Sequence, residues 1–140
     1  MIEFTFNTDF ILDNKKQISD WLLSLANHEG FSVKNLHYSF VSVEKIQSIN
    51  NQFLNHDYPT DVIAFDYCED KDLSGEVFIS PKIVEQNAVS YSQTVENELL
   101  RVLCHALFHL CGYKDKSSKD LAVMRSAEDK AIAAFHSTYK

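Results

Sequence analysis

Two histidines four residues apart, in an apolar stretch that ends at a glycine, are the residues of this sequence best suited to chemistry. They are His105 and His109 in HALFHLCGYKD, where Gly112 is followed three residues later by Asp115. On a helix the two imidazoles lie roughly 40° apart around the axis and about 6 Å along it, so both can point at one atom. The pattern H-x3-H-x2-G-x2-D has the spacing of zinc sites whose third ligand follows a glycine turn.

The helix around these histidines is apolar on most sides and has one polar stripe, about 80° wide. The stripe contains Glu98, Arg101, His105 and His109. We therefore expect a helix that is buried on most sides and faces a cleft with its stripe. Gly112 can take a positive φ and end the helix, which lets Asp115 approach the histidines. The alternative is that both histidines are core residues satisfied by hydrogen bonds, with Asp115 at the start of the next helix.

Hydrophobic periodicity predicts the elements that position this helix. Alternation in MIEFTFN and FSVKNLHYSFV indicates two strands, and the apolar runs DVIAFDY and EVFIS indicate two more, joined as a hairpin by the acidic loop CEDKDLSG. Helices are expected from Asp13 to Gly30, after Ser42, from Ser80 and Pro81, from near Thr94 to Cys111, and from about Ser117. The last helix carries Leu121, Met124, Glu128, Ile132 and Phe135 at helical spacing.

The order βαβαββααα predicts one α+β domain over residues 1–140. We expect a small mixed four-stranded sheet packed with about five helices, and a metal site at the C-terminal end of a central helix.

Composition narrows the class of protein. The chain has 140 residues, the size of one domain, and its hydrophobic content of 45% fits a globular protein. No apolar run approaches the ~18 residues of a membrane span, and the amino terminus lacks the pattern of a signal peptide. Three cysteines at no paired spacing agree with a reducing compartment. We therefore expect a cytoplasmic protein with no membrane partner.

The net charge of −7 speaks against a generic nucleic-acid binder, because phosphate contacts need Lys and Arg. The segment from Lys114 to Arg125 is locally basic. It is either a small phosphate-facing patch or a solvated helix start.

Three blocks of this sequence resemble the YbeY family of bacterial rRNA maturation factors. The stretch HALFHLCGYKD resembles the family signature H-G-x-L-H-L-x-G-Y-D-H, INNQFLNHDYPTDVIAF resembles the block P-T-D/N-V-L-S-F with its preceding loop, and Gly75 to Ser80 resembles G-D/E-hydrophobic-x-I-S. The blocks occur in the family's order and spacing and cover most of the chain from about residue 45. The resemblance implies a single-metal-dependent endoribonuclease that acts on rRNA with components of the small ribosomal subunit.

The resemblance also implies a ligand set of His105, His109 and Asp115 for one zinc ion. The family usually has His at the third position. Asp binds zinc at similar distances, but it makes the site one charge more negative and the metal a weaker Lewis acid.

Two further departures concern the substrate phosphate. The family's Arg before the P-T-D block aligns with Leu54, and its small polar residue before Phe aligns with Ala64. If that Arg binds the scissile phosphate, this chain needs a substitute. Arg101 is the first candidate, with His56 and Lys114 behind it. Asp61 borders the cleft by resemblance.

The function expected from these residues is a single-strand-specific endoribonuclease of 16S rRNA 3′-end maturation and ribosome quality control. It would hydrolyse RNA phosphodiesters with a metal-activated water, with Arg101, Asp61 and Lys114 as catalytic residues. One alternative is a zinc peptidase, although Ala106 stands where that class has its proton-accepting Glu. Another is a non-catalytic ribosome-associated factor with a structural zinc, which the missing Arg and the acidic composition favour.

Overall fold

The computed structural model describes residues 1–55 and 60–139. Within them the chain forms four strands and five helices: β1 (Ile2–Phe6), α1 (Lys15–His28), β2 (Ser32–Phe40), α2 (Val43–Leu54), β3 (Val62–Asp66), β4 (Asp72–Ile79), α3 (Pro81–Ser90), α4 (Val95–Leu110) and α5 (Ser118–Thr138). This confirms the predicted α+β class and element order. No helix in the described part of the chain combines the length and the apolar composition needed to cross a membrane.

The strands form one mixed sheet in the order β1-β2-β4-β3. Pairing is parallel between β1 and β2 and between β2 and β4, and antiparallel between β3 and β4, as the predicted hairpin requires. The hairpin is longer than the sequence pattern indicated. Strand β4 begins at Asp72, and a further bridge joins Glu69 to Asp72, so part of the predicted acidic loop is paired backbone.

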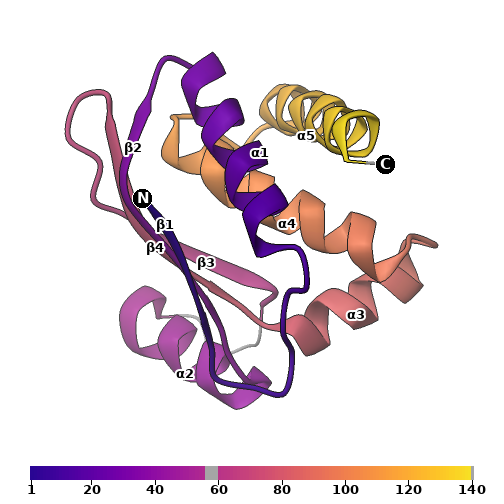
Figure 1. The fold of residues 1–140 in the computed structure, drawn as a ribbon. Coiled ribbons are helices and arrows are strands. Elements are labelled where there is room, and N and C mark those ends of the chain that lie inside the picture. The colour runs from indigo at the N-terminus through magenta and orange to yellow at the C-terminus, as the bar shows by residue number, and fades with distance from the viewer. Residues whose placement is uncertain (56–59, 140) are drawn as a thin grey trace.

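Helices cover both faces of the sheet. Figure 1 shows α1, α4 and α5 on one side and α2 on the other. Alternate residues of the edge strand β3 divide accordingly, because successive side chains of a strand point to opposite faces. Ile63 is buried in the smaller cluster with α2, whereas Val62 and Ala64 pack against the main core, which contains most of α4.

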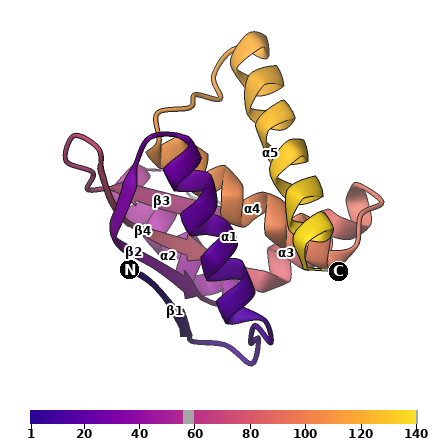
Figure 2. The same ribbon diagram turned by 45° about the horizontal axis from the view of Figure 1, so that its top comes forward.

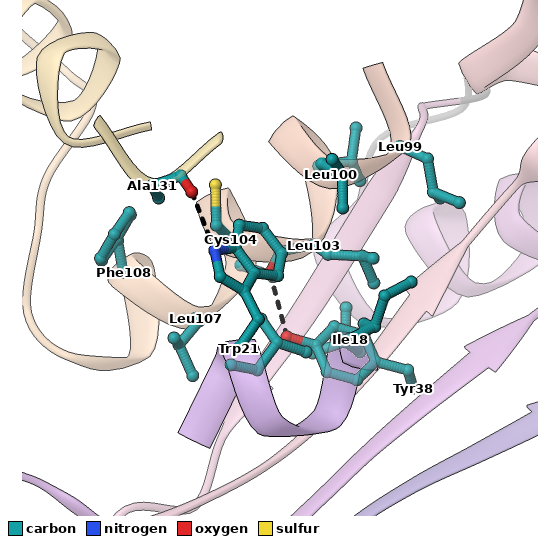
Figure 3. Close-up of a cluster of buried hydrophobic side chains, with 14 of the residues drawn as sticks. Ile18, Trp21, Tyr38, Leu99, Leu100, Leu103, Cys104, Leu107, Phe108 and Ala131 are labelled. Carbon is teal, nitrogen blue, oxygen red and sulfur yellow. Dashed lines mark hydrogen bonds between the residues drawn. The ribbon is translucent and has the colours of Figure 1, made fainter. Parts of the chain in front are cut away.

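Two buried polar side chains fix α4 and its neighbours within this core. Trp21 of α1 donates its indole N–H to the Ala131 carbonyl of α5 at 2.8 Å, and Tyr38 of β2 donates its hydroxyl to the Leu103 carbonyl of α4 at 3.0 Å (Figure 3). Each satisfies the polar end of a large aromatic side chain that is otherwise packed against apolar atoms. The sheet thereby holds α4, the helix with the histidines, in place, and α1 holds α5.

Helix starts mostly follow the capping signals in the sequence. The side-chain oxygens of four N-cap residues accept the backbone N–H three residues on: Ser42, Ser80, Thr94 and Ser117. Helix α1 is the exception. It was expected from Asp13 but begins at Lys15, and its N-cap Asn14 makes no side-chain cap hydrogen bond. The buried Leu12 ties the preceding segment to the core, which keeps that segment out of the helix.

Candidate functional site

Helix α4 ends in a turn that depends on glycine. Gly112 has a φ of +104°, its N–H donates to the His109 carbonyl at 3.1 Å, and the Tyr113 N–H donates to the Phe108 carbonyl at 3.0 Å. These two bonds are those of a Schellman motif. The motif's usual apolar contact is the pairing of the Phe108 and Tyr113 rings, whose centroids are 5.0 Å apart. The predicted positive φ at Gly112 is confirmed, and the chain turns back toward the histidines.

The turn brings Asp115 to both histidines. Its Oδ2 atom lies 3.8 Å from His105 Nε2 and 3.7 Å from His109 Nε2. The imidazole centroids are 5.8 Å apart with the rings at 75° to each other. The fold therefore brings together the three side chains proposed as ligands, and their binding of a metal stays a prediction.

The second nitrogen of each ring contacts an acceptor. His105 Nδ1 is 2.7 Å from Glu128 Oε2, and His109 Nδ1 is 3.1 Å from the Tyr113 carbonyl oxygen. Because a carboxylate and a carbonyl only accept hydrogen bonds, Nδ1 is the protonated nitrogen in both rings. In the neutral rings, each Nε2 keeps its lone pair on the side of Asp115.

Glu128 belongs to α5 and is only 3% exposed. Its Oε1 atom accepts a hydrogen bond from Arg101 Nη1 at 2.9 Å, and Arg101 Nη2 donates to Asp129 Oδ1 at 2.7 Å. Arg101 therefore joins α4 to α5, which lie side by side in Figures 1 and 2.

The surroundings of His105 favour its protonated form. Burial of the ring opposes a charge there, but the hydrogen bond to Glu128 and the negative charges of Glu128, Asp115 and Asp61 outweigh burial and raise the pKa of His105.

His105, His109 and Asp115 line one wall of a cleft of about 460 Å³. The end of α2 and the edge strand β3 form the opposite wall, which includes Asn50, Leu54 and the residues from Thr60 to Ala64. Ala106, next to the first histidine, also lines the cleft. Leu54 and Ala64, the two departures from the family pattern that concern the substrate phosphate, thus both lie in the cleft.

Asp61 lies in the cleft, as the resemblance implied. Its Oδ2 atom accepts a hydrogen bond from Asn87 at 3.3 Å, and burial raises the pKa of its carboxyl group. Asp61 therefore keeps its proton to a higher pH than an ordinary aspartate. Glu98 is 4% exposed, and its pKa is also raised, first by burial and then by the charge of Asp61.

The predicted polar stripe of α4 is only partly in the cleft. His105 and His109 line it, whereas Glu98 and Arg101 do not, because Arg101 is directed to the carboxylates of α5. Lys114 is exposed beside Asp115. His56, the other candidate, is outside the described residues. Among the described residues, neither Lys nor Arg lines the cleft.

The chemistry of the donor set fits zinc. Two imidazole nitrogens and one carboxylate oxygen are zinc ligands, and metal-binding histidines typically donate their other N–H to a carboxylate or a carbonyl, as here. In residues 1–55 and 60–139 no group of three or more His, Cys, Asp and Glu side chains already has the arrangement of a metal site. Tetrahedral zinc separates its ligand atoms by about 3.4 Å, so the distances of 3.8 and 3.7 Å from Asp115 Oδ2 to the two Nε2 atoms would have to shorten by a few tenths of an ångström.

The sequence interpretation missed two contacts of the site, those of Glu128 and of the Tyr113 carbonyl. Glu128 did leave a signal: it is an acidic residue at helical spacing with Met124 and Ile132, on the face that α5 buries. The carbonyl of Tyr113 left none, because every residue has one.

Known proteins share both the sequence and the fold of this chain. The family described as Endoribonuclease YbeY matches residues 4–136. The protein named Endoribonuclease YbeY from Flavobacterium johnsoniae is 44% identical over 136 residues, which cover 97% of this chain and 98% of that protein. The one from Phocaeicola vulgatus is 43% identical over 119 residues, or 85% and 86% of the two chains. The solution structure of TM1509 from Thermotoga maritima aligns with a TM-score of 0.67 at 27% identity over 99% of this chain and 94% of that one.

Proposed function

Because this chain belongs to the Endoribonuclease YbeY family, we propose that it is a metal-dependent hydrolase of single-stranded RNA. We further propose that it acts in the cytoplasm in 16S rRNA 3′-end maturation and ribosome quality control, together with components of the small ribosomal subunit.

The observation that carries the proposal is the arrangement of the two histidines. Their Nδ1 atoms donate to Glu128 and to the Tyr113 carbonyl, and their Nε2 atoms face one oxygen of Asp115 at the wall of the cleft. A role in packing alone does not explain why the Nε2 atoms of both histidines face the same carboxylate at the wall of a cleft.

In this proposal His105, His109 and Asp115 hold one zinc ion, which when bound would activate a water and polarise a phosphoryl oxygen. Asp61 lies in the same cleft, and burial raises the pKa of its carboxyl group, which favours Asp61 as the proton donor to the leaving oxygen as the phosphorus–oxygen bond breaks. Lys114, exposed beside Asp115, supplies positive charge to the phosphate. Arg101 holds α4 to α5 and is not needed at the phosphate in this scheme.

The absence of Lys and Arg from the described cleft wall favours a second candidate. This is a non-catalytic ribosome-associated factor in which zinc only joins the end of α4 to the following loop. A zinc peptidase has less support, because Ala106 lines the cleft and has no group that accepts a proton.

The proposal is tested by elemental analysis of protein purified without chelators, wild type beside Asp115→Ala, followed by cleavage of single-stranded and structured rRNA fragments. We expect about one zinc per chain in the wild type and much less in the variant. Cleavage should be lost with chelator and restored by zinc. Equal metal in both proteins would remove Asp115 from the ligand set. If the protein binds zinc but cleaves no RNA, the non-catalytic ribosome-associated factor is the remaining candidate.

A further inference from the structure

The least exposed acidic side chain near the histidines comes from a different helix. Glu128 of α5 is 3% exposed, and both of its oxygens are engaged with α4: Oε1 with Arg101 Nη1 at 2.9 Å and Oε2 with His105 Nδ1 at 2.7 Å. A second guanidinium, that of Arg125, has its Nε atom 3.6 Å from Oε1. A carboxylate this deeply buried is costly unless it is paired and hydrogen-bonded. Here Arg101 compensates its charge, and the second oxygen remains for the imidazole.

The two oxygens have different consequences. The bond to Arg101 attaches α5 to α4, and Asp129 makes a similar bond at 2.7 Å to the same guanidinium. The bond to His105 determines which ring nitrogen carries the proton and which way the ring faces. With Nδ1 protonated, Nε2 has the free lone pair, and that atom is the one nearest Asp115.

We propose that Glu128 is the positioning residue of His105: it fixes the Nδ1–H tautomer and the ring orientation, and thereby the readiness of Nε2 to bind a metal. The inference rests on the proposed function for the metal, but the tautomer is a property of the protein without metal. The packing of α5 against α4 is then part of the site, because the orientation of the His105 imidazole is fixed by Glu128, which belongs to α5.

The variant Glu128→Gln tests this role because its amide cannot serve both neighbours. With the amide oxygen toward His105, the NH2 group meets the donor Nη1 of Arg101. With the oxygen toward Arg101, the NH2 group faces His105 Nδ1, which must then accept, so that the proton moves to Nε2. The matched control is Asp129→Asn, which alters a bond to the same guanidinium from a side chain that is 60% exposed and makes no bond to either histidine.

Zinc affinity is measured by competition with a chelator, and folding of each variant by circular dichroism and urea unfolding. We expect Glu128→Gln to bind zinc about 10- to 100-fold more weakly than wild type, the usual effect of losing the partner of a ligating histidine. Asp129→Asn should stay within roughly threefold of the wild type. Equal losses in the two variants would overturn the proposal, since α5 docking alone would then account for both.

A second readout needs no variant. Nitrogen-15 spectra of the imidazoles in metal-free wild type at mildly alkaline pH should show His105 protonated on Nδ1, and a proton on Nε2 would overturn the proposal even if Glu128→Gln failed to fold. If the wild type bound no zinc, the zinc site of the proposed function would be wrong. These spectra would still decide whether Glu128 sets the tautomer of His105.

Discussion

Substitution of Gly112 by alanine isolates the contribution of the turn that follows α4. Gly112 has a φ of +104°, and a Cβ built on it meets no atom within 4 Å. The cost of the substitution is therefore backbone strain rather than collision. Residues with a Cβ pay about 1 to 2 kcal/mol in the left-handed region. For a chain of this size that lowers the melting temperature by roughly 3 to 7 °C.

The chain contains its own control at the end of α1. Gly30 has a φ of +87° and equally free space, and the bonds from Gly30 N–H to Asn27 and from Phe31 N–H to Ala26 repeat the pattern of the α4 turn. Gly30→Ala should therefore lose a similar amount of stability. Gly112→Ala acts directly on the chain that leads to Asp115, whereas Gly30 lies in the turn after α1, whose Glu29 accepts a hydrogen bond from the Tyr113 hydroxyl at 3.1 Å.

Metal affinity and RNA cleavage separate the two variants. We expect Gly112→Ala to lower kcat/KM by about 10- to 100-fold, because displacements of about an ångström at a site have effects of this size. Gly30→Ala should cleave RNA within about twofold of the wild type under conditions where both variants are folded. Urea unfolding establishes those conditions.

A Gly112→Ala protein that is destabilised as expected but binds metal and cleaves RNA like Gly30→Ala would refute the reasoning. It would mean that Asp115 reaches its position without the turn, or that it has no part in the site.

Three further changes test the fold that carries the site. Burial raises the pKa of Glu98, so the contribution of this carboxyl group to stability is present below its unfolded-state pKa of about 4.3 and is lost as the pH rises through its folded-state pKa. In urea unfolding with chelator present, the free energy of unfolding of Glu98→Gln should therefore rise relative to that of the wild type as the pH goes from acid to neutral. A difference between the two proteins that stays constant with pH would contradict this. A Cβ on Gly75 would lie 2.7 Å from the Phe65 carbonyl oxygen, so Gly75→Ala should cost about 1 to 3 kcal/mol in the same assay, whereas an unchanged midpoint would show that the hairpin yields freely. Trp21→Phe removes the bond to Ala131 and should cost about 1 to 2 kcal/mol by circular dichroism, and no loss would mean that this bond adds nothing to the docking of α5.

Local features of the chain were predictable because short-range signals determine them. Ser42, Ser80, Thr94 and Ser117 cap helices that begin at the next residue, and Gly112 takes the positive φ that its place after an apolar helix required. The mixed sheet followed from the order of the elements and from one hairpin. The caps, the glycine turn and the hairpin each use residues that are close together in the sequence, where the physical cause is local.

The interactions between distant elements were not predictable in the same way. Arg101 was placed at the substrate phosphate because it shares a stripe with the histidines, but a helix stripe does not say which neighbour it faces. In the fold, Arg101 faces Glu128 and Asp129, which are 27 and 28 residues away in sequence. Likewise, nothing local indicates that Gly75 must lack a side chain. A Cβ there would lie 2.7 Å from the Phe65 carbonyl oxygen of β3 and 3.0 Å from Leu110 Cδ1 of the distant helix α4.

These distant contacts resolve an apparent conflict between an acidic chain and an RNA substrate. In the part of the chain that the structure describes, Asp61 and Asp115 line the cleft and Glu128 contacts His105 from α5, yet their charges are not simply added. Glu128 is paired with Arg101, and partial burial raises the pKa of the Asp61 carboxyl group above that of an ordinary aspartate. Asp115 is then the carboxylate that a bound cation would offset. In the proposed function, positive charge for the phosphate would come from the bound metal and from the exposed Lys114, so removal of the metal with a chelator should weaken both RNA binding and cleavage.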